Sequence, residues 1–220
     1  MRIGVLYGCI LLPGNSFLIH HSSTAQPHRS ASSFPASQST KTAWNRQQLE
    51  DYAQRQGIVL TFTTLGPAYR CIARSQHNTT QVLGYVEGIL RPSPLLHLDK
   101  MEVFRPMVQR ARAENPAFTG GGVSLGVGLL MGYLCLLHGQ ENGCKKAEFL
   151  AIDDEEKQHK RLVRYYRHAG FQFIKYVGDD IWDVPDRLVW GGCGTLLGAN
   201  IDELLQFWTR LMQKSDDQKL

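Results

Sequence analysis

Apolar residues recur with two different periods along the chain, and the change of period separates strands from helices. Between residues 58 and 104, β-branched, aromatic and aliphatic residues alternate with polar ones, which is typical of strands with one buried face. Turn-forming residues interrupt the alternation at Gly66-Pro67 and in the proline-rich stretch 91–94. The pattern therefore predicts three or four antiparallel strands, at residues 58–65, 68–74, 81–90 and 95–104.

Beyond residue 104, helical spacing alternates with short apolar runs. The run at residues 148–152 is continuously apolar, as expected of a strand buried on both faces. Further strands are predicted at residues 171–177 and 188–197. Helices are predicted at residues 47–56, 105–114, 129–140, 155–168 and 201–212. Strands that come first and then alternate with helices around one sheet indicate a mixed α/β or α+β fold.

The first 46 residues lack this patterning. Residues 1–49 contain four basic residues and no acid, and residues 16–39 are rich in Ser, Ala, Pro and Gln. Such a segment cannot bury enough surface to offset the entropy of ordering. We therefore expect a disordered targeting leader over residues 1–46 and a single domain with a C-terminal helix over residues 47–220. Abundant serine with sparse arginine favours import into a plastid or chloroplast stroma, with a cytoplasmic location as the alternative.

Charge and cysteine content exclude several classes of function. The formal net charge of +4 arises in the leader, because residues beyond 49 hold 24 − 4 = 20 basic residues against 20 acids. We therefore expect no nucleic-acid partner. No apolar run reaches membrane-spanning length, so no membrane partner is expected either. Five cysteines without a C-x-x-C pair indicate neither a disulfide framework nor a zinc site, and no metal is expected.

A glycine-rich turn precedes the predicted helix 129–140. Main-chain amides at Gly126, Val127 and Gly128 would lack partners within the helix and lie at the positive end of its dipole, which suits a phosphate. No Gly-Lys-Ser/Thr follows, so the turn is not a P-loop, and Met131 stands where a dinucleotide fingerprint needs its third glycine. The sequence predicts an anion-binding turn outside these two classes.

Three sets of residues resemble motifs of the GNAT superfamily of acyl-CoA N-acetyltransferases. Gly126, Val127 and Gly128 occupy the family's Q/R-x-x-G-x-G/A loop, residues 147–153 (AEFLAID) resemble its central strand, and Tyr166 precedes Gly170-Phe171 as in its Y-x-x-x-G-F motif. The resemblance covers residues 60–199. The run QHKRLVRYYRHAGF and the later DRLVWGGCG are also similar to plastid and cyanobacterial members.

The chain departs from the family at three places. Val123 stands where the family usually has Gln or Arg, which puts one side-chain contact to the pyrophosphate in doubt. Lys160 stands where the family often carries Asn. The segment 104–122 is much longer than the usual link between the acceptor strand and the loop, so substrate specificity is expected to reside there.

The resemblance implies a fold and a cosubstrate. The implied fold is a mixed, mostly antiparallel sheet whose splayed central strands are flanked by helices, and the implied cosubstrate is acetyl-CoA, without a metal. Its binding residues would be Glu102, Val103 and Phe104 through their main chains, together with Lys160 and Tyr166. The loop and first helical turn would add Val123, Ser124, Leu125, Gly126, Val127, Gly128 and Leu129.

Four residues are candidates for catalysis, one as an acid and three as a base. The resemblance makes Tyr166 the general acid that protonates the departing CoA thiolate, whereas its neighbour Tyr165 is interpreted as a packed aromatic. Asp99 and Glu102 are candidate general bases, and strand alternation predicts that they lie on different faces. His97, at the start of the same strand, is a third option for the base.

Several functional alternatives remain open. Because no cysteine lies at the motif positions, we expect the amine to attack acetyl-CoA directly in a ternary complex. The amine is a protein N-terminus, a protein lysine or a small molecule, and the expected partner is a protein or peptide substrate. The alternatives are a non-catalytic acyl-CoA-binding module and an assembly partner that keeps the sheet without the pocket. The oligomeric state is not predicted.

Overall fold

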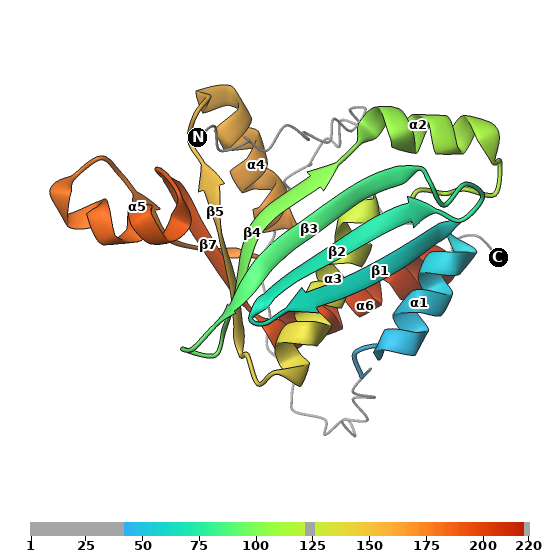
Figure 1. Cartoon of the computed structure of the whole chain (residues 1–220), viewed down its shortest axis with the longest axis horizontal. Helices are drawn as coiled ribbons and strands as arrows, with labels where there is room; N and C mark the ends of the chain where they lie inside the picture. Colours follow the sequence, from blue (N-terminus) through green and yellow to red (C-terminus); the bar gives the residue numbers. More distant parts are fainter. Residues whose placement is uncertain (1–41, 122–125, 218–220) are drawn as a thin grey trace, which may run out of the picture.

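The structure is a computed structural model of the 220-residue chain, and it describes residues 42–121 and 126–217 (Figure 1). Residues 1–41, which make up most of the predicted leader, lie outside the described residues. The leader and its role in targeting therefore stay predictions from the sequence. No helix in the described residues is both long and apolar enough to span a membrane.

Within the described part of the chain, seven strands form one sheet in the order β1-β2-β3-β4-β5-β7-β6. Neighbouring strands are antiparallel throughout, except for β4 and β5, which run parallel. The strands are β1 (Ile58–Leu65), β2 (Ala68–Ser75), β3 (Val82–Arg91), β4 (Leu95–Val103), β5 (Lys146–Ile152), β6 (Gln172–Val177) and β7 (Gly194–Asn200). The predicted fold class, a mixed and mostly antiparallel sheet flanked by helices, is confirmed.

The helices lie mainly on one face of the first four strands. The helices of the described residues are α1 (Arg46–Arg55), α2 (Arg105–Glu114), α3 (Gly126–Glu141), α4 (Glu156–His168), α5 (Val184–Trp190) and α6 (Ile201–Asp217), with a 3-10 turn η1 (Ile181–Asp183) before α5. In the view of Figure 1, α1, α3 and α6 lie behind β1–β4, and the near face of these strands is open. This open side is called the outer face below.

Helix α3 is the centre of the core. It is apolar on nearly every side, and it packs against β1–β4 as well as against α1 and α6. Fully burying a leucine or methionine side chain stabilises the fold by about 1.5–3 kcal/mol, so the long apolar run of α3 contributes strongly. Gly132 and Gly139 permit this packing, because a Cβ on either would lie 3.1 Å from the side chain of Trp208 or Leu96, respectively.

The predicted strand at residues 188–197 is wrong in its first part. Residues 184–190 form helix α5, and the strand begins only at Gly194. Pro185 stands in the first turn of α5, where a missing amide costs nothing, and Gly191 ends the helix with a left-handed φ of 78°. A short apolar run such as Leu188-Val189-Trp190 suits either a strand or a helix, so its period did not distinguish the two.

Two helix boundaries also differ from the prediction. Helix α3 begins at Gly126 and not at Leu129, so the predicted glycine turn forms the first turn of the helix. Helix α6 extends to Asp217, five residues beyond the predicted end at Met212, because its polar C-terminal residues continue the helix without contributing to the apolar stripe. By contrast, α2 spans the predicted residues 105–114 and ends before Pro116.

Candidate functional site

Strands β4 and β5 separate shortly after they meet. They pair only at Leu95–Lys146, Leu96–Ala147 and His97–Glu148. Beyond these three pairs, β4 continues to Val103 and β5 continues to Ile152 without further pairing between them. The central strands are therefore splayed, as the resemblance predicts, and each presents unpaired backbone to the opening.

An apolar cleft occupies this opening and has an empty volume of about 560 Å³ that includes space open to solvent. The strands β4 and β5, the first turns of α3 and the inner side of α4 all contribute to its walls. The lining residues are Leu98, Asp99, Lys100, Met101, Gly128, Leu129, Gly132, Phe149, Leu150, Tyr165, Tyr166, Ala169, Phe171 and Trp208. The motif residues Gly128, Phe149, Tyr166 and Phe171, which are far apart in sequence, thus meet at one site.

The main chain of β4 has one side directed at β3 and the other at the cleft. The amide of Phe104 donates to the carbonyl oxygen of Leu83, and its own carbonyl accepts from the amide of Val108. Since bonded pairs alternate along an antiparallel ladder, the main chain of Glu102 is directed at β3 as well. The main chains of Glu102 and Phe104 are therefore directed away from the opening, whereas those of Val103 and, in addition, Met101 face it. The predicted contacts of Glu102, Val103 and Phe104 with the cosubstrate stay predictions.

The spacing of the Y-x-x-x-G-F motif has a structural cause. Gly170 adopts a φ of 102°, which ends α4 and turns the chain back so that the amide of Phe171 donates to the carbonyl oxygen of Tyr166 over 3.1 Å. The buried ring of Tyr166 then packs against Phe149, with ring centroids 4.0 Å apart. Its hydroxyl donates to the sulfur of Met101 at 3.9 Å, which places the phenol on the cleft wall.

Tyr165 also lines the cleft, which the sequence interpretation of a packed aromatic did not foresee. Its ring meets Tyr166 edge-on, with centroids 5.3 Å apart and planes at 78°. Burial raises the pKa of the Tyr165 phenol above its ordinary value, and the neighbouring Tyr166 adds to the shift. The consecutive tyrosines were the only available sequence signal for this second hydroxyl.

The first turn of α3 lies at the edge of the cleft. Gly126 has a left-handed φ of 55°, and Val127, Gly128 and Leu129 are buried. A Cβ on Gly128 would lie 3.5 Å from the sulfur of Met101 and 3.8 Å from the hydroxyl oxygen of Tyr165, so the backbone here borders the cleft directly. The remaining predicted loop residues, Val123, Ser124 and Leu125, lie outside the described residues.

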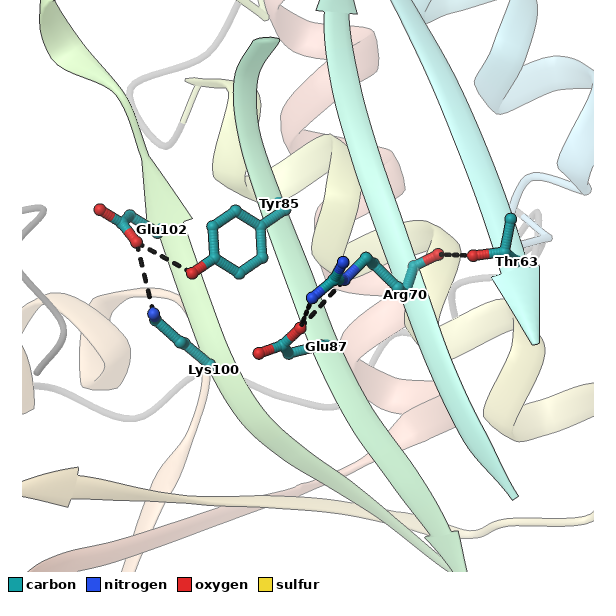
Figure 2. A network of polar contacts seen from close by, with 6 residues as sticks. All are labelled: Thr63, Arg70, Tyr85, Glu87, Lys100 and Glu102. Atoms are coloured by element: carbon teal, nitrogen blue, oxygen red, sulfur yellow. Dashed lines mark hydrogen bonds and ion pairs between the residues drawn. The ribbon is translucent and has the colours of Figure 1, made fainter. Parts of the chain in front are cut away.

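Glu102 belongs to a polar network on the outer face of the sheet (Figure 2). Its carboxylate accepts a hydrogen bond from the Tyr85 hydroxyl at 3.0 Å and forms an ion pair with Lys100 at 3.6 Å. Burial is the main cause of a raised pKa at Tyr85, and a hydrogen bond with Tyr85 is the main cause of a raised pKa at Lys100. In the same view Arg70 forms two bonds to Glu87.

Asp99 is the extra residue of a β-bulge in β4. Glu87 pairs with Lys100 but Gly88 pairs with Leu98, so Asp99 has no partner on β3. The bulge changes the alternation, and Asp99 reaches a groove on the outer face together with Thr63, Arg70 and Glu87. The prediction that Asp99 and Glu102 lie on different faces is therefore wrong. Contact with His97 is the main cause that lowers the pKa of Asp99 below its ordinary value.

Lys160 lies on another side of α4. Its exposed side chain pairs with Glu156 on the same helix, and this hydrogen bond raises the pKa of Lys160. It lines a separate open groove with His159, Val163, Arg164, Arg167, His168 and Thr195. The structure therefore does not place Lys160 on the cleft wall with Tyr166.

Among the described residues, the cleft lining contains no cysteine. Cys71, Cys135 and Cys144 are buried, whereas Cys193 is half-buried one residue before β7 and donates a hydrogen bond to Asp179. Across residues 42–121 and 126–217, no group of three or more His, Cys, Asp or Glu side chains is arranged to hold a metal ion.

Comparisons with known proteins give matches only at the level of structure. No family model matches the chain, and no curated protein matches its sequence. An acetyltransferase of the GNAT family from Staphylococcus aureus Mu50 is 14% identical with a TM-score of 0.42, covering 75% of this chain and 85% of that chain. A spermidine N-acetyltransferase from Vibrio cholerae is 10% identical with a TM-score of 0.41, covering 74% and 94%.

A third similar structure is a Bacillus subtilis acetyltransferase in complex with CoA. It is 10% identical with a TM-score of 0.37, and the match covers 70% of this chain and 83% of that chain. At these TM-scores the similarities are too distant to assign an activity or residue roles. Both are therefore inferred from the geometry of the cleft.

Proposed function

We propose that the chain is a GNAT-type N-acyltransferase that transfers the acetyl group of acetyl-CoA to an amine. The observation that carries this proposal is the splay of β4 from β5 after three residue pairs, which opens an apolar cleft edged by unpaired strand backbone. A pantetheine arm is an extended chain that contains amide groups. It matches this opening because it can bond to the main chains of Met101 and Val103 in place of a neighbouring strand.

The first turn of α3 supports binding of the pyrophosphate. Main-chain amides at the start of a helix lack partners within that helix, and the dipole favours negative charge there. The turn from Gly126 to Leu129 borders the cleft, with a glycine where a side chain would narrow the approach. We therefore assign the diphosphate of CoA to this turn and the pantetheine arm to the cleft.

The reaction that this arrangement supports is a direct transfer. The amine nitrogen attacks the thioester carbonyl, the C–N bond forms, the C–S bond breaks, and the thiolate takes a proton from the Tyr166 hydroxyl. The amine releases its proton to Asp99 or to a water beside it. A cleft-facing amide of β4 donates to the carbonyl oxygen, an effect worth about 3–4 kcal/mol per donor in acyl transfer.

The acceptor we propose is the N-terminus or a lysine of a protein or peptide. Support comes from the outer groove at Asp99, which is lined by residues of β1, β2 and β3 and is open to solvent. Deprotonating a lysine at pH 7 costs about 4.6 kcal/mol, against about 1 kcal/mol for an α-amine, so an N-terminus makes the smaller demand on a base.

One observation favours a second candidate, a non-catalytic acyl-CoA-binding module. The carboxylate of Glu102 is engaged by Tyr85 and Lys100, and the lowered pKa of Asp99 makes it a weak base. A cleft without an effective base would bind the thioester without passing it to an amine. A small amine as the acceptor is the remaining alternative.

Two measurements test the proposal. Calorimetry of CoA and acetyl-CoA against the protein should give binding that is weakened in Gly128→Leu, because the new side chain fills the cleft edge, and unchanged in the control Gly192→Ala, where a Cβ meets open space. Absence of CoA binding would overturn the proposal.

The second measurement is turnover of acetyl-CoA with a peptide that has a free N-terminus, an N-blocked peptide that contains lysine, and spermidine. Acetylation of a peptide supports the proposal, and acetylation of spermidine alone supports the small-amine alternative. Binding of CoA without transfer to any of the three supports the module. Mass spectrometry of proteins acetylated after expression in a host that lacks such an activity would then separate N-terminal from lysine targets.

A further inference from the structure

We propose that His97, held in place by Arg91 and by Trp190 of α5, positions the carboxylate of Asp99 where the cleft meets the outer groove, and that Asp99 there binds the ammonium form of the acceptor. This inference rests on the proposed acyl transfer and adds to it a cationic acceptor, its direction of approach and three positioning residues. It also gives α5, which the sequence did not predict, a role in the site.

Asp99 stands where two cavities meet. It lines both the apolar cleft and the outer groove, and its side chain is 64% exposed. It is the acidic residue among those that line the cleft. The nearby carboxylates have partners of their own, because Glu87 accepts two bonds from Arg70 and Glu102 binds Tyr85 and Lys100. Asp99 is thus the carboxylate best placed to meet an amine that reaches from the groove towards the thioester.

The hydrogen-bonding pattern of His97 fixes which ring nitrogen carries hydrogen. His97 is 4% exposed, and its Nδ1 lies 2.5 Å from a terminal nitrogen of the Arg91 guanidinium. A guanidinium only donates hydrogen bonds, so Nδ1 must accept and the hydrogen of the imidazole resides on Nε2. Nε2 lies 3.8 Å from a carboxylate oxygen of Asp99, a distance for an electrostatic contact and not for a direct hydrogen bond.

Helix α5 holds this arrangement from the other side. The ring of Trp190 stacks on His97 with centroids 4.2 Å apart and planes 18° from parallel. The Arg91 guanidinium lies 4.8 Å from the centre of the same indole and donates to the carbonyl oxygen of Val189 at 3.3 Å. Trp190 is buried although its helix neighbour Leu188 is exposed, so α5 directs one large side chain inward onto the histidine.

The backbone around the bulge leaves little freedom for these side chains. A Cβ on Gly88 would overlap the carbonyl oxygen of His97 and the hydroxyl of Tyr69, and that hydroxyl already donates to the same carbonyl at 3.0 Å. Among the charged and titratable groups of the described residues, His97, Lys100 and Tyr69 interact with Asp99, and Arg70 and Glu87 line the same outer groove. Of the groups that lower its pKa, His97 has the largest effect.

The first experiment follows the carboxyl resonance of Asp99 by NMR in the full chain labelled with ¹³C-aspartate. Its disappearance in Asp99→Asn assigns the signal. We expect His97→Phe, which keeps a ring against Trp190 but removes both nitrogens, to raise the pKa of Asp99, and His97→Gln, which keeps a donor, to restore it in part. Trp190→Ala should raise this pKa as well, whereas Trp190→Phe should not. An unchanged Asp99 pKa in both His97→Phe and Trp190→Ala would overturn the positioning role.

The second experiment adds spermidine or a lysine peptide in the presence of CoA. If the carboxyl resonance of Asp99 shifts with the amine, Asp99 binds the acceptor, and an unresponsive resonance overturns that part of the proposal. Neither experiment requires turnover. A chain that binds CoA and amine without transferring the acetyl group would contradict the proposed function but not the inference.

Where turnover occurs, kinetics provide a sharper test. Asp99→Asn should raise the KM for the amine about 10- to 100-fold, since a hydrogen bond to a charged group is lost, without changing the affinity for acetyl-CoA. His97→Phe should raise KM less, and the double variant should be no worse than Asp99→Asn alone. Asp51→Asn, the same change at an exposed position of α1, is the control. Additive effects of the two single changes would contradict a role of His97 through Asp99.

Discussion

The two sides of strand β4 differ in kind, although they are built from alternating residues of one short segment. On the α3 side, Met101 and Val103 approach Gly128, and the wall is mostly apolar, with the tyrosine hydroxyls among its few polar groups. On the outer side, Lys100 and Glu102 join a network of charged and hydroxyl side chains (Figure 2). The difference shows how one strand can present an apolar cleft to one ligand and a charged surface to another.

The bulge brings Asp99 to the place where the two sides of β4 meet. A change that distorts the backbone at the bulge should therefore have the largest effect. Gly88→Ala would place a methyl group on the carbonyl oxygen of His97, and backbone atoms cannot yield cheaply. We expect a loss of about 3 kcal/mol in the free energy of unfolding, measured by urea denaturation. Gly192→Ala, at an open position, is the matched control and should change stability by less than about 0.5 kcal/mol. Equal stability of the two variants would contradict the close approach at Gly88.

The apolar side can be tested through the hydroxyl of Tyr166. Tyr166→Phe keeps the packing against Phe149 and removes the proton donor. We expect kcat to fall about 100-fold, as for loss of a general acid, while the affinity for acetyl-CoA is unchanged. Tyr165→Phe on the same wall serves as the comparison and should lower kcat much less. A larger decrease of kcat in Tyr165→Phe than in Tyr166→Phe would identify Tyr165 as the general acid instead.

The charged side has a signature in the pH dependence of stability. Because the pKa of Asp99 is lower in the folded chain than the value of about 3.9 for a free aspartate, its contribution is present above pH 4 and is lost as pH falls through the folded pKa. Asp99→Asn should therefore destabilise the protein relative to wild type at pH 6 and less so at pH 3. Urea denaturation at both pH values measures this, and an identical difference at the two would contradict the shift.

The smallest expected effect concerns the pair of Arg70 and Glu87 at the outer edge of the network. Both side chains are partly exposed, at 55% and 29%, so solvent weakens their attraction. A double-mutant cycle of Arg70→Met and Glu87→Gln should give a coupling energy of at most about 1 kcal/mol that decreases with added salt. A coupling insensitive to salt would mean that this part of the outer face is drier than its exposure indicates.

The same contrast explains how far the sequence could predict the structure. β-branched and aromatic residues that partly alternate predicted β1 at residues 58–65, and a proline at 116 predicted the end of α2, since both signals are local. The position of the bulge depends on the contact of Gly88 with His97 and Tyr69, which no local pattern records. Helix α5 was missed because three apolar residues have no distinguishable period.

For the site, motif spacing correctly brought Gly128 and Tyr166 to one cleft, because Gly170 turns the chain at a fixed distance from the tyrosine. It could not predict the direction of the main chains of Glu102 and Phe104, which depends on the register with β3. The sequence identified Tyr165 only as a packed aromatic and His97 only as a possible base, for a related reason. Their surroundings come from α3 and α5, elements distant in sequence whose packing only the folded chain defines.

The short pairing of β4 with β5 also has a mechanical consequence. Only three residue pairs join the two halves of the sheet directly, so elsewhere they are held together by side-chain packing around α3 and α6. This junction is a seam along which the molecule should open before either half unfolds, and amides on its two sides should exchange with solvent as separate cooperative units. A ligand that contacts both β4 and β5 would link the two halves of the sheet. Saturation with CoA should therefore slow amide hydrogen exchange in both halves together.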